Sequence, residues 1–305
     1  MTDILVTGKT GQVGRELARR LAPLGRVLAT GRNELDLASP DSIRRAMRQF
    51  SPRIVVNAAA YTAVDKAESE PELALQVNAV GPGVLAEEAK RVNALLVHYS
   101  TDYIFDGLLG RPYVEDDAPN PLNVYGKTKL AGERAIGAVG GAYLILRTSW
   151  IYSDQPPNFV LTMLKLAGER SEIAVVDDQV GSPTWARSLA EATAELVRQE
   201  AQARERGGIY HLSALGYATR HAFAKRIFEV ASALSGGEFR QPTLRPIRTE
   251  DYPLPAARPL NCPTSKEKVK TVFGVEMSNW TTQLEACMAQ LLPRNAAGAV
   301  QQREA

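Results

Sequence analysis

The stretch Asp3-Ile-Leu-Val-Thr-Gly-Lys-Thr-Gly-Gln-Val-Gly14 combines a short apolar segment, a glycine-rich turn and the start of a helix. Because its apolar residues are continuous, the segment is typical of a strand buried on both faces of a parallel sheet. Glycines between such a strand and a helix let backbone N–H groups approach a pyrophosphate, whose charge the helix N-terminus attracts. Gly8, Gly11 and Gly14 follow the spacing G-x-x-G-x-x-G, not G-x-G-x-x-G, and a turn without a ligand is the alternative. The strand–turn–helix setting favours a dinucleotide site.

The rest of the N-terminal half alternates apolar strands with helices. Strands are expected at 26–30, 53–57, 94–100 and 143–148, and a long helix at 71–92. This alternation predicts an α/β protein with a Rossmann-type doubly wound parallel sheet. In such sheets ligands bind where the carboxyl ends of the strands gather. The residues that fall at such ends are Gly8, Arg32, Ala60, Thr101 and Trp150.

The chain is expected to divide into two parts. Residues 1–150 are predicted to form an NAD(P)-binding Rossmann domain, and residues 151–292 mainly a smaller α/β substrate-binding domain. A helix rich in Ala, Glu and Arg at 184–206 is expected to return to the Rossmann domain. The segment 244–263 contains five prolines and is predicted to be a loop. The small, polar residues 293–305 are predicted to be a disordered tail.

The composition argues against several classes of protein. The 305 residues are 45% hydrophobic and 23% charged, and the net charge of +2 comes from scattered basic residues, which argues against nucleic-acid binding. No apolar run reaches the length of a membrane span and the chain opens directly into a strand, so we expect a cytoplasmic protein without a membrane partner. Cys262 and Cys287 are expected to be free thiols in a reducing compartment rather than a disulfide.

Tyr125 and Lys129 lie in Asn123-Val-Tyr-Gly-Lys-Thr-Lys-Leu-Ala-Gly-Glu133, which is predicted to be helical. Four residues make about one helical turn, so the phenol and the ammonium share a face. A cation beside a phenol favours the phenolate, and we therefore expect a lowered pKa for Tyr125 and a role in proton transfer. Alone the motif is weak evidence, because an exposed helix often carries an ordinary Tyr and Lys.

Arg32 follows the second strand, where a Rossmann domain meets the adenosine ribose of its dinucleotide. No acidic residue stands at positions 30–33 to accept a hydrogen bond from a 2′-hydroxyl, and Glu34 can turn away. A guanidinium there can bind the 2′-phosphate of NADPH, whereas a solvated Arg32 is the alternative. NADPH is therefore the predicted cofactor, with NADH as the second option. Other residues expected to lie beside the cofactor are Asp36, Leu37, Ala58 and Ala60.

Over about residues 3–292 the chain resembles the extended short-chain dehydrogenase/reductase family. The motifs that carry the resemblance are Thr7-Gly8-x-x-Gly11-x-x-Gly14, Asn57-Ala-Ala-Ala60, Ser100-Thr-Asp102 and Tyr125-x-x-x-Lys129. Further stretches, such as His98-Tyr-Ser-Thr-Asp-Tyr103 and Arg147-Thr-Ser-Trp150, resemble the branch that reduces dTDP-4-dehydro-β-L-rhamnose at C4 with NAD(P)H. That reaction is the last step of dTDP-L-rhamnose synthesis, so the resemblance implies a dTDP-sugar substrate.

The resemblance also implies roles for individual residues. Tyr125 would protonate the oxygen at C4, and Lys129 would hold the nicotinamide ribose and lower the pKa of Tyr125. Thr101 would tune this proton transfer and contact the substrate, and Asp102 and Trp150, carried over by position, would contact the sugar. The residues implied to line the cofactor are Gly11, Gln12, Val13, Asp36, Leu37, Ala60, Tyr61 and Thr62.

Some members of the family form dimers bridged by a magnesium ion that glutamates hold. Glu16 matches one ligand position, but Arg187 and, with a looser alignment, Gln290 occupy the others. A cation site built around an Arg is electrostatically unfavourable. We therefore expect no metal, and either a monomer or a dimer that no metal bridges.

Two other functions fit the same fold. A sugar-nucleotide epimerase or dehydratase would retain its NAD, but family dehydratases carry an Asp-Glu pair where this chain has Asp102-Tyr103. A non-catalytic cofactor-binding regulatory subunit is the second alternative, and the intact Thr101, Tyr125 and Lys129 argue against it. Net oxidation of NADPH distinguishes the reductase from both.

Overall fold

The computed structural model describes residues 2–292, so the predicted tail at 293–305 lies outside the described residues. A six-stranded parallel sheet with strand order β10-β5-β4-β3-β1-β2 forms its centre. The predicted α/β class with a doubly wound parallel sheet is confirmed. The strands are β1 (Thr2–Thr7), β2 (Gly25–Thr30), β3 (Ile54–Asn57), β4 (Leu95–Thr101), β5 (Tyr143–Thr148) and β10 (Gly208–His211).

The strand order creates a switch point beside β1. From β1 the chain adds β2 on one side and then crosses back to place β3 on the other. The crevice outside the carboxyl ends at such a reversal is where open α/β sheets bind ligands. The turns that begin at Gly8 and Ala58 border this crevice.

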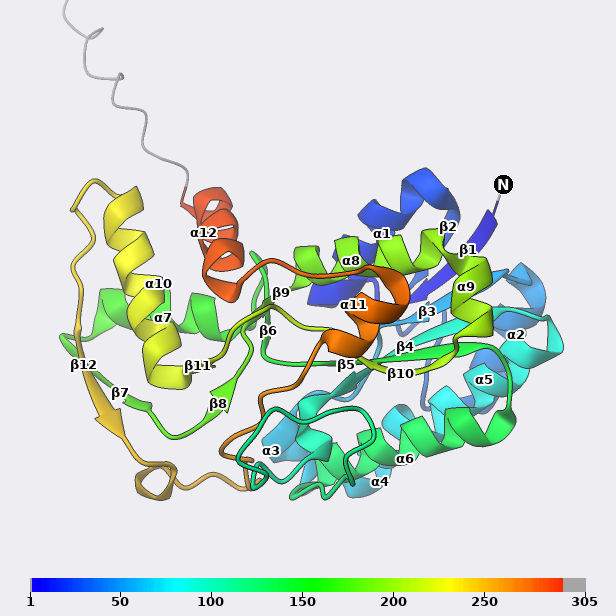
Figure 1. Cartoon of the computed structure of the whole chain (residues 1–305), viewed down its shortest axis with the longest axis horizontal. Helices are drawn as coiled ribbons and strands as arrows, with labels where there is room; N and C mark the ends of the chain where they lie inside the picture. Colours follow the sequence, from blue (N-terminus) through cyan, green and yellow to red (C-terminus); the bar gives the residue numbers. More distant parts are fainter. Residues whose placement is uncertain (1, 293–305) are drawn as a thin grey trace, which may run out of the picture.

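Helices cover both faces of the sheet (Figure 1), because its strands are apolar on both sides. Ile4 and Val6 of β1 belong to one core, and Leu5 between them belongs to the opposite core. The first core is completed by α1 (Gln12–Leu21), α8 (Ala186–Arg198), α9 (Glu200–Glu205) and α11 (Glu267–Phe273). The second is completed by α2 (Pro40–Phe50), α5 (Gly81–Arg91) and α6 (Val124–Val139).

The helix predicted at 71–92 contains one π-helical turn. This turn, η2 (Gln76–Val80), joins α4 (Pro71–Leu75) directly to α5, and the short α3 (Val64–Ala67) precedes them. The buried Asn78 lies in it and bonds the backbone N–H and C=O of Tyr61 at 2.8 and 3.0 Å. The π turn therefore fixes the loop that follows β3, a placement common for such turns at functional sites.

A smaller group of elements lies beside the sheet, at the left of Figure 1, and has its own apolar core. It contains α7 (Phe159–Glu169), α10 (Arg220–Leu234), α12 (Trp280–Leu291) and the parallel strands β7 (Glu172–Val176) and β12 (Thr243–Ile247). β12 contradicts the prediction that 244–263 is entirely loop. Pro246 is tolerated in it because a two-stranded sheet has only edge strands.

The prediction of one helix at 184–206 is wrong in two places. The segment opens as a strand, β9 (Thr184–Trp185), paired with β6 (Ile151–Tyr152), and it breaks at Gln199 between α8 and α9. The remaining short elements are η1 (Ala22–Leu24), η3 (Asp102–Ile104), η4 (Thr249–Asp251), and β8 (Val180–Gly181) paired with β11 (Ala218–Thr219).

The predictions on cysteines and membrane spans can also be compared with the structure. Cys262 and Cys287 are both free, as predicted, and both are buried. Burial raises the pKa of the Cys287 thiol to about 12, which keeps it protonated and unreactive. Within residues 2–292 every helix is too short or too polar to cross a membrane.

A buried ion pair attaches α6 to β5. Arg147 donates two hydrogen bonds to Glu133, at 3.0 and 2.7 Å, and both side chains are almost completely buried. Arg147 also donates to the backbone oxygen of Glu115 at 3.1 Å. Removing one member of such a pair leaves an uncompensated charge in the interior.

We predict that Glu133→Gln lowers the free energy of unfolding by about 3–5 kcal/mol, because Arg147 then keeps a buried charge without a counterion. Urea denaturation measures the change. The matched control is Glu195→Gln, which breaks an exposed pair with Arg198 and should cost at most about 1 kcal/mol. The double variant Glu133→Leu/Arg147→Met should recover much of the loss; equal stability of Glu133→Gln and wild type would contradict the prediction.

Candidate active site

A cavity of about 950 Å³ opens over the carboxyl ends of the parallel strands. Its walls come from the turns after β1, β3, β4 and β5, from α6, and from the smaller group of elements. The structure thus brings together residues as far apart in the sequence as Gly8 and Arg220. The predicted residues that line the cavity are Gly8, Gly11, Gln12, Val13, Arg32, Asp36, Leu37, Ala58, Ala60, Tyr61, Thr62, Thr101, Asp102, Tyr125, Lys129 and Trp150.

The glycine turn is shaped for a group that approaches the backbone. Gly8 has a φ of +75°, and a Cβ added there would lie 2.9 Å from the backbone nitrogen of Ala59. Gly14, a predicted cofactor residue, does not line the cavity; a Cβ there would lie 2.0 Å from the Gly8 carbonyl oxygen. Gly8 therefore lets the turn lie against the loop after β3, and Gly14 lets α1 pack closely on the turn. Gly8 and Gly11 line the cavity, where a turn without side chains suits a dinucleotide pyrophosphate.

Two cations stand where β2 ends. Arg32 lines the cavity with its side chain 72% exposed, and its Nε lies 3.5 Å from Asp36 Oδ2. Such an exposed pair is weak, so Arg32 can exchange Asp36 for a phosphate. Lys9, which sequence reasoning missed, pairs with Glu34, and Glu34 also accepts a hydrogen bond from the Gly31 N–H at 2.9 Å. In this structure Glu34 therefore stays at the end of β2 and does not turn away.

The start of α6 is fixed from two directions. Asn123 caps the helix by accepting a hydrogen bond from the Gly126 N–H at 2.8 Å. Its amide nitrogen donates to the backbone oxygen of Ala257, in the chain between η4 and α11, at 2.7 Å. A Cβ at Gly126 would lie 2.2 Å from the Tyr103 carbonyl oxygen, so close backbone packing sets the position of this first turn.

Tyr125 and Lys129 project from α6 into the cavity, but their electrostatics differ from the expectation. Burial penalises the phenolate and raises the pKa of Tyr125, while a hydrogen bond with Thr101 opposes this effect. The Lys129 ammonium donates to the Tyr99 carbonyl oxygen at 2.6 Å and lies 3.1 Å from His98 Nε2. Burial lowers the pKa of Lys129 to about 8. The predicted lowering of the Tyr125 pKa is therefore wrong, because spacing alone ignores desolvation.

Asp102 is buried beside these groups at the end of β4. Its carboxylate accepts hydrogen bonds from Ser149 Oγ at 2.6 Å and from Thr101 Oγ1 at 3.1 Å. Burial raises the pKa of Asp102 to about 6, and the two hydrogen bonds oppose that rise. Asp102 therefore orients the Thr101 hydroxyl next to Tyr125. Sequence reasoning missed Ser149.

Trp150 forms a wall of the cavity together with Arg220. Trp150 has an uncommon φ of +44°. Its ring packs directly on Gly181, where an added Cβ would lie 2.5 Å from a ring carbon. The Arg220 guanidinium stacks on this ring, 3.5 Å from its centroid. Sequence reasoning missed Arg220. It is the first residue of α10, 70 positions after Trp150, and no local pattern indicates that the two side chains meet.

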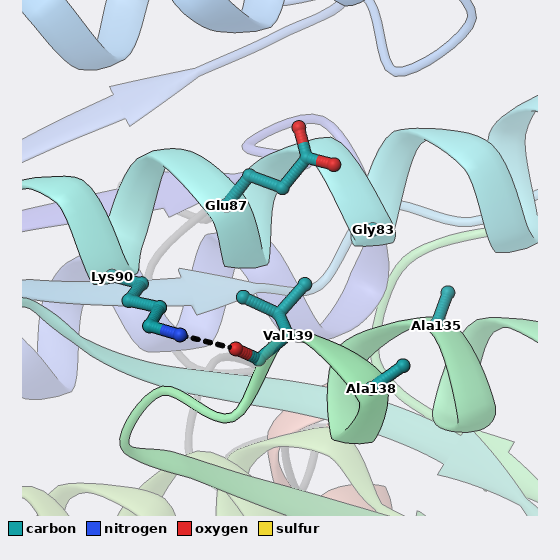
Figure 2. Close-up of a pocket in the computed structure, with 6 residues that line it drawn as sticks. All are labelled: Gly83, Glu87, Lys90, Ala135, Ala138 and Val139. Atoms are coloured by element: carbon teal, nitrogen blue, oxygen red, sulfur yellow. Dashed lines mark hydrogen bonds between the residues drawn. The ribbon is translucent and has the colours of Figure 1, made fainter.

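A second depression lies on the outer surface between α5 and α6 (Figure 2). Gly83, Ala135 and Ala138 form half of its lining, and Lys90 Nζ closes one end by donating to the Val139 carbonyl oxygen at 2.7 Å. None of the predicted site residues lines it. The candidate active site is therefore the cavity at the strand ends.

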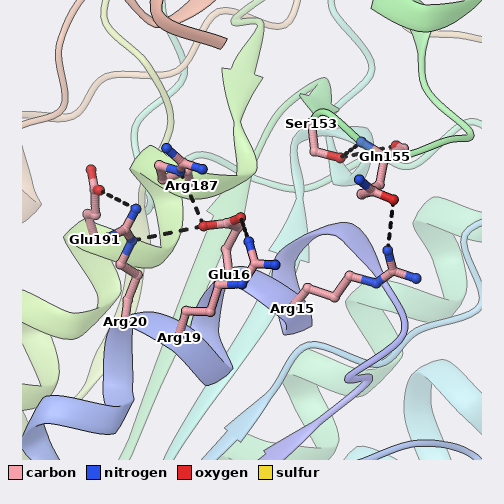
Figure 3. Close-up of polar contacts among 8 residues, drawn as sticks. All are labelled: Arg15, Glu16, Arg19, Arg20, Ser153, Gln155, Arg187 and Glu191. Atoms are coloured by element: carbon pink, nitrogen blue, oxygen red, sulfur yellow. Dashed lines mark hydrogen bonds and ion pairs between the residues drawn. The ribbon is translucent and has the colours of Figure 1, made fainter. Parts of the chain in front are cut away.

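Glu16, which matches a metal-ligand position, faces arginines (Figure 3). Its carboxylate lies 3.3 Å from Arg187 Nε across the contact between α1 and α8. Arg19 and Arg20 approach the same carboxylate to 3.2 and 3.9 Å. Within residues 2–292, no three His, Cys, Asp or Glu side chains are arranged to hold a metal ion. Guanidinium groups thus neutralise Glu16.

Figure 3 also shows how α1 holds the loop between β6 and α7. Arg15 donates to the Gln155 side-chain oxygen at 3.0 Å, and Ser153 Oγ donates to the Gln12 side-chain oxygen at 2.8 Å. Gln155 lines the cavity, and sequence reasoning missed it. This loop therefore borders the glycine turn from the opposite side.

Comparisons with known proteins agree with this geometry. A family model described as the RmlD substrate binding domain matches residues 1–292. A Burkholderia thailandensis protein named dTDP-4-dehydrorhamnose reductase is 46% identical over 95% of this chain and 99% of its own length. The Escherichia coli protein of the same name is 43% identical over 96% and 99%.

Solved structures extend the match to three dimensions. A Bacillus anthracis dTDP-4-dehydrorhamnose reductase, determined in complex with NADP, has a TM-score of 0.88 at 33% identity and covers 95% of this chain and 99% of its own. A UDP-glucose 4-epimerase from Thermus thermophilus has a TM-score of 0.77 at 20% identity, which shows a shared fold alone. The match of the family model and the identity to relatives over nearly their whole length show that the chain belongs to the dTDP-4-dehydrorhamnose reductase family.

Proposed function

We propose that this protein uses NADPH to reduce the C4 keto group of dTDP-4-dehydro-β-L-rhamnose and so forms dTDP-L-rhamnose. The observation that carries the proposal is the convergence of Thr101, Tyr125 and Lys129 on one cavity beside the Gly8 turn. Membership of a family of dTDP-4-dehydrorhamnose reductases supports the substrate, and the NADP bound to the Bacillus anthracis relative supports the cofactor.

The glycine turn would hold the cofactor pyrophosphate, and Arg32 would bind the 2′-phosphate. When bound, the reduced nicotinamide supplies the hydride. Tyr125 keeps its proton at neutral pH because burial raises its pKa, and it donates this proton to the oxygen at C4. Lys129, held by Tyr99 and His98, would direct its remaining N–H toward the ribose and the phenol. Thr101, whose hydroxyl donates to Asp102 in this structure, would turn its proton to the reacting oxygen when the substrate is bound.

The substrate would lie against the opposite wall. Trp150 offers an aromatic face to the sugar, and the stacked Arg220 offers positive charge to a diphosphate. Both carboxylate oxygens of Asp102 accept hydrogen bonds from within the protein. We therefore assign to Asp102 the orientation of Thr101 as its main role, and contact with the sugar as a minor one.

We further propose that 1–150 is the cofactor-binding domain and that 151–292 is mainly the sugar-nucleotide domain, with 184–206 belonging to the first. The large core shared by β1, α1 and α8 supports this division. The protein would act in the cytoplasm on a dTDP-sugar, without a nucleic-acid or membrane partner. It would be a monomer or a dimer that no metal bridges.

The proposed activity is tested by following NADPH absorbance in the presence of dTDP-4-dehydro-L-rhamnose. Stoichiometric oxidation of NADPH with formation of dTDP-L-rhamnose is the expected result. We predict that Tyr125→Phe lowers kcat by about 10²–10⁴-fold, the usual value of a general acid, and leaves NADPH binding unchanged. Tyr252→Phe, which removes a phenol from an exposed loop, is the control. Sugar conversion without net oxidation would instead show an epimerase, and absence of turnover a binding subunit.

The second prediction concerns the choice of cofactor. NADPH should be preferred over NADH in kcat/KM, because a charge-assisted hydrogen bond contributes about 10- to 150-fold in affinity. Arg32→Ala should erode this preference mainly by raising KM for NADPH. Arg245→Ala, which removes another exposed guanidinium far along the chain on β12, should leave it intact. Equal kcat/KM for both cofactors in the unmutated enzyme would refute the assignment of Arg32.

The third prediction concerns metal ions. EDTA should change neither the activity nor the mass measured by light scattering, because Arg187, Arg19 and Arg20 already neutralise Glu16. A loss of either property that Mg²⁺ restores would contradict this reading of the contact between α1 and α8.

A further inference from the structure

A chain of buried polar side chains runs across three neighbouring strands to Lys129. Thr7, Asn57 and His98 stand in register on β1, β3 and β4, and each is at most 1% exposed. Thr7 Oγ1 lies 2.5 Å from Asn57 Oδ1, and Asn57 Nδ2 lies 2.9 Å from His98 Nδ1. His98 Nε2 then lies 3.1 Å from Lys129 Nζ. At its far end, Thr7 accepts a hydrogen bond from the Ala59 N–H of the cavity wall at 3.2 Å.

This row of hydrogen-bonded side chains allows two arrangements of protons, which correspond to two charge states of Lys129. An ammonium can only donate, so His98 Nε2 must accept, Nδ1 must carry the proton, and the Asn57 amide must turn its oxygen toward Nδ1. With the amide nitrogen facing Nδ1, which is how Asn57 is placed here while its oxygen accepts from Thr7, Nε2 carries the proton and can be satisfied only by a neutral Lys129 amine. Turning the Asn57 amide by half a turn exchanges this arrangement for the first. The pKa of His98 is well below its usual value, since burial and the Lys129 charge both oppose protonation, so His98 stays neutral throughout.

We propose that His98 is a positioning residue for the reaction, which orients Lys129 through Nε2 and stabilises its ammonium form. The proposal rests on the function proposed above. A buried ammonium needs acceptors for its hydrogens. One is the Tyr99 carbonyl oxygen, and His98 Nε2, 3.1 Å from Nζ, is the second once the Asn57 amide turns its oxygen toward Nδ1. With two hydrogens engaged, the third points into the cavity that Lys129 lines.

The other charged groups near Lys129 do not replace His98. Glu133 stands four residues along α6 and favours the ammonium, but both of its oxygens accept hydrogen bonds from Arg147 of β5. Tyr125, one turn earlier, stays protonated because of its raised pKa. His98 on β4 is therefore the side chain placed to accept directly from Lys129.

The test uses two amides that each imitate one nitrogen of the imidazole. His98→Gln keeps an acceptor near the position of Nε2, facing Lys129. His98→Asn keeps a partner near the position of Nδ1 for Asn57 and removes the acceptor from Lys129. Both variants leave a space in the core. Each therefore controls for the loss of packing in the other, and a difference between them reports the hydrogen bond.

We predict that the two variants differ in the pH profile of kcat/KM. The ammonium is the active form, so activity falls as the pH rises through the pKa of Lys129. Loss of an acceptor destabilises the ammonium, so His98→Asn should move this alkaline limb down by about one pH unit, and lower kcat/KM about tenfold near the limb. His98→Gln should keep the limb of the wild type. Thermal unfolding and NADPH fluorescence monitor the fold and cofactor binding.

A spectroscopic measurement on the unmutated enzyme covers the case in which His98→Asn does not fold. The sequence has three histidines, so ¹⁵N chemical shifts of the labelled protein at pH 7, assigned with His98→Gln, report which nitrogen of His98 is protonated. The expected state is Nδ1–H. A proton on Nε2 at pH 7, or identical alkaline limbs in wild type and His98→Asn, would overturn the proposal. Failure of the proposed function would appear differently, as an unmutated enzyme that does not oxidise NADPH.

Discussion

The burial of one ammonium, that of Lys129, constrains the elements around the active site. A cation that is 2% exposed must be surrounded by acceptors at hydrogen-bonding distance, and these come from Tyr99 and His98 of the central strand β4. The helix that carries Lys129 must therefore lie very close to the sheet. Gly132 makes this possible, because a Cβ there would lie 2.1 Å from the Asn78 carbonyl oxygen in the π-helical turn. Close packing of α6 against that turn thus brings the Lys129 ammonium within reach of its acceptors on β4.

Local patterns in the sequence were sufficient to predict the central parallel sheet. Continuous apolar runs placed the five N-terminal strands of the sheet, and the Gly8 turn placed the edge at which ligands bind, because both depend on neighbouring residues. The strand β12 was missed because the five prolines of 244–263 suggested a loop, whereas its pairing with β7 comes from distant residues. The break at Gln199 was missed because Ala, Glu and Arg continue through it with high helix propensity.

The candidate site was predictable in its list of residues and less so in its electrostatics. Spacing placed Tyr125 and Lys129 on one face, but the depth of burial reversed the expected direction of the Tyr125 pKa. Arg220 and Gln155 reach the cavity from the smaller group of elements, so no local pattern marks them. Lys9 lay inside the quoted glycine turn, but its approach to Glu34 depends on the pairing of β1 with β2.

The side chain of Asn123 has a consequence for motion. Its oxygen caps α6 and its nitrogen holds the Ala257 backbone, so one planar amide joins the first turn of the helix to a segment more than 130 residues away. If that segment swings outward, the amide loses a partner at the same end of α6 that carries Tyr125. Release of that segment would therefore also remove a restraint from the helix turn that carries the proton donor.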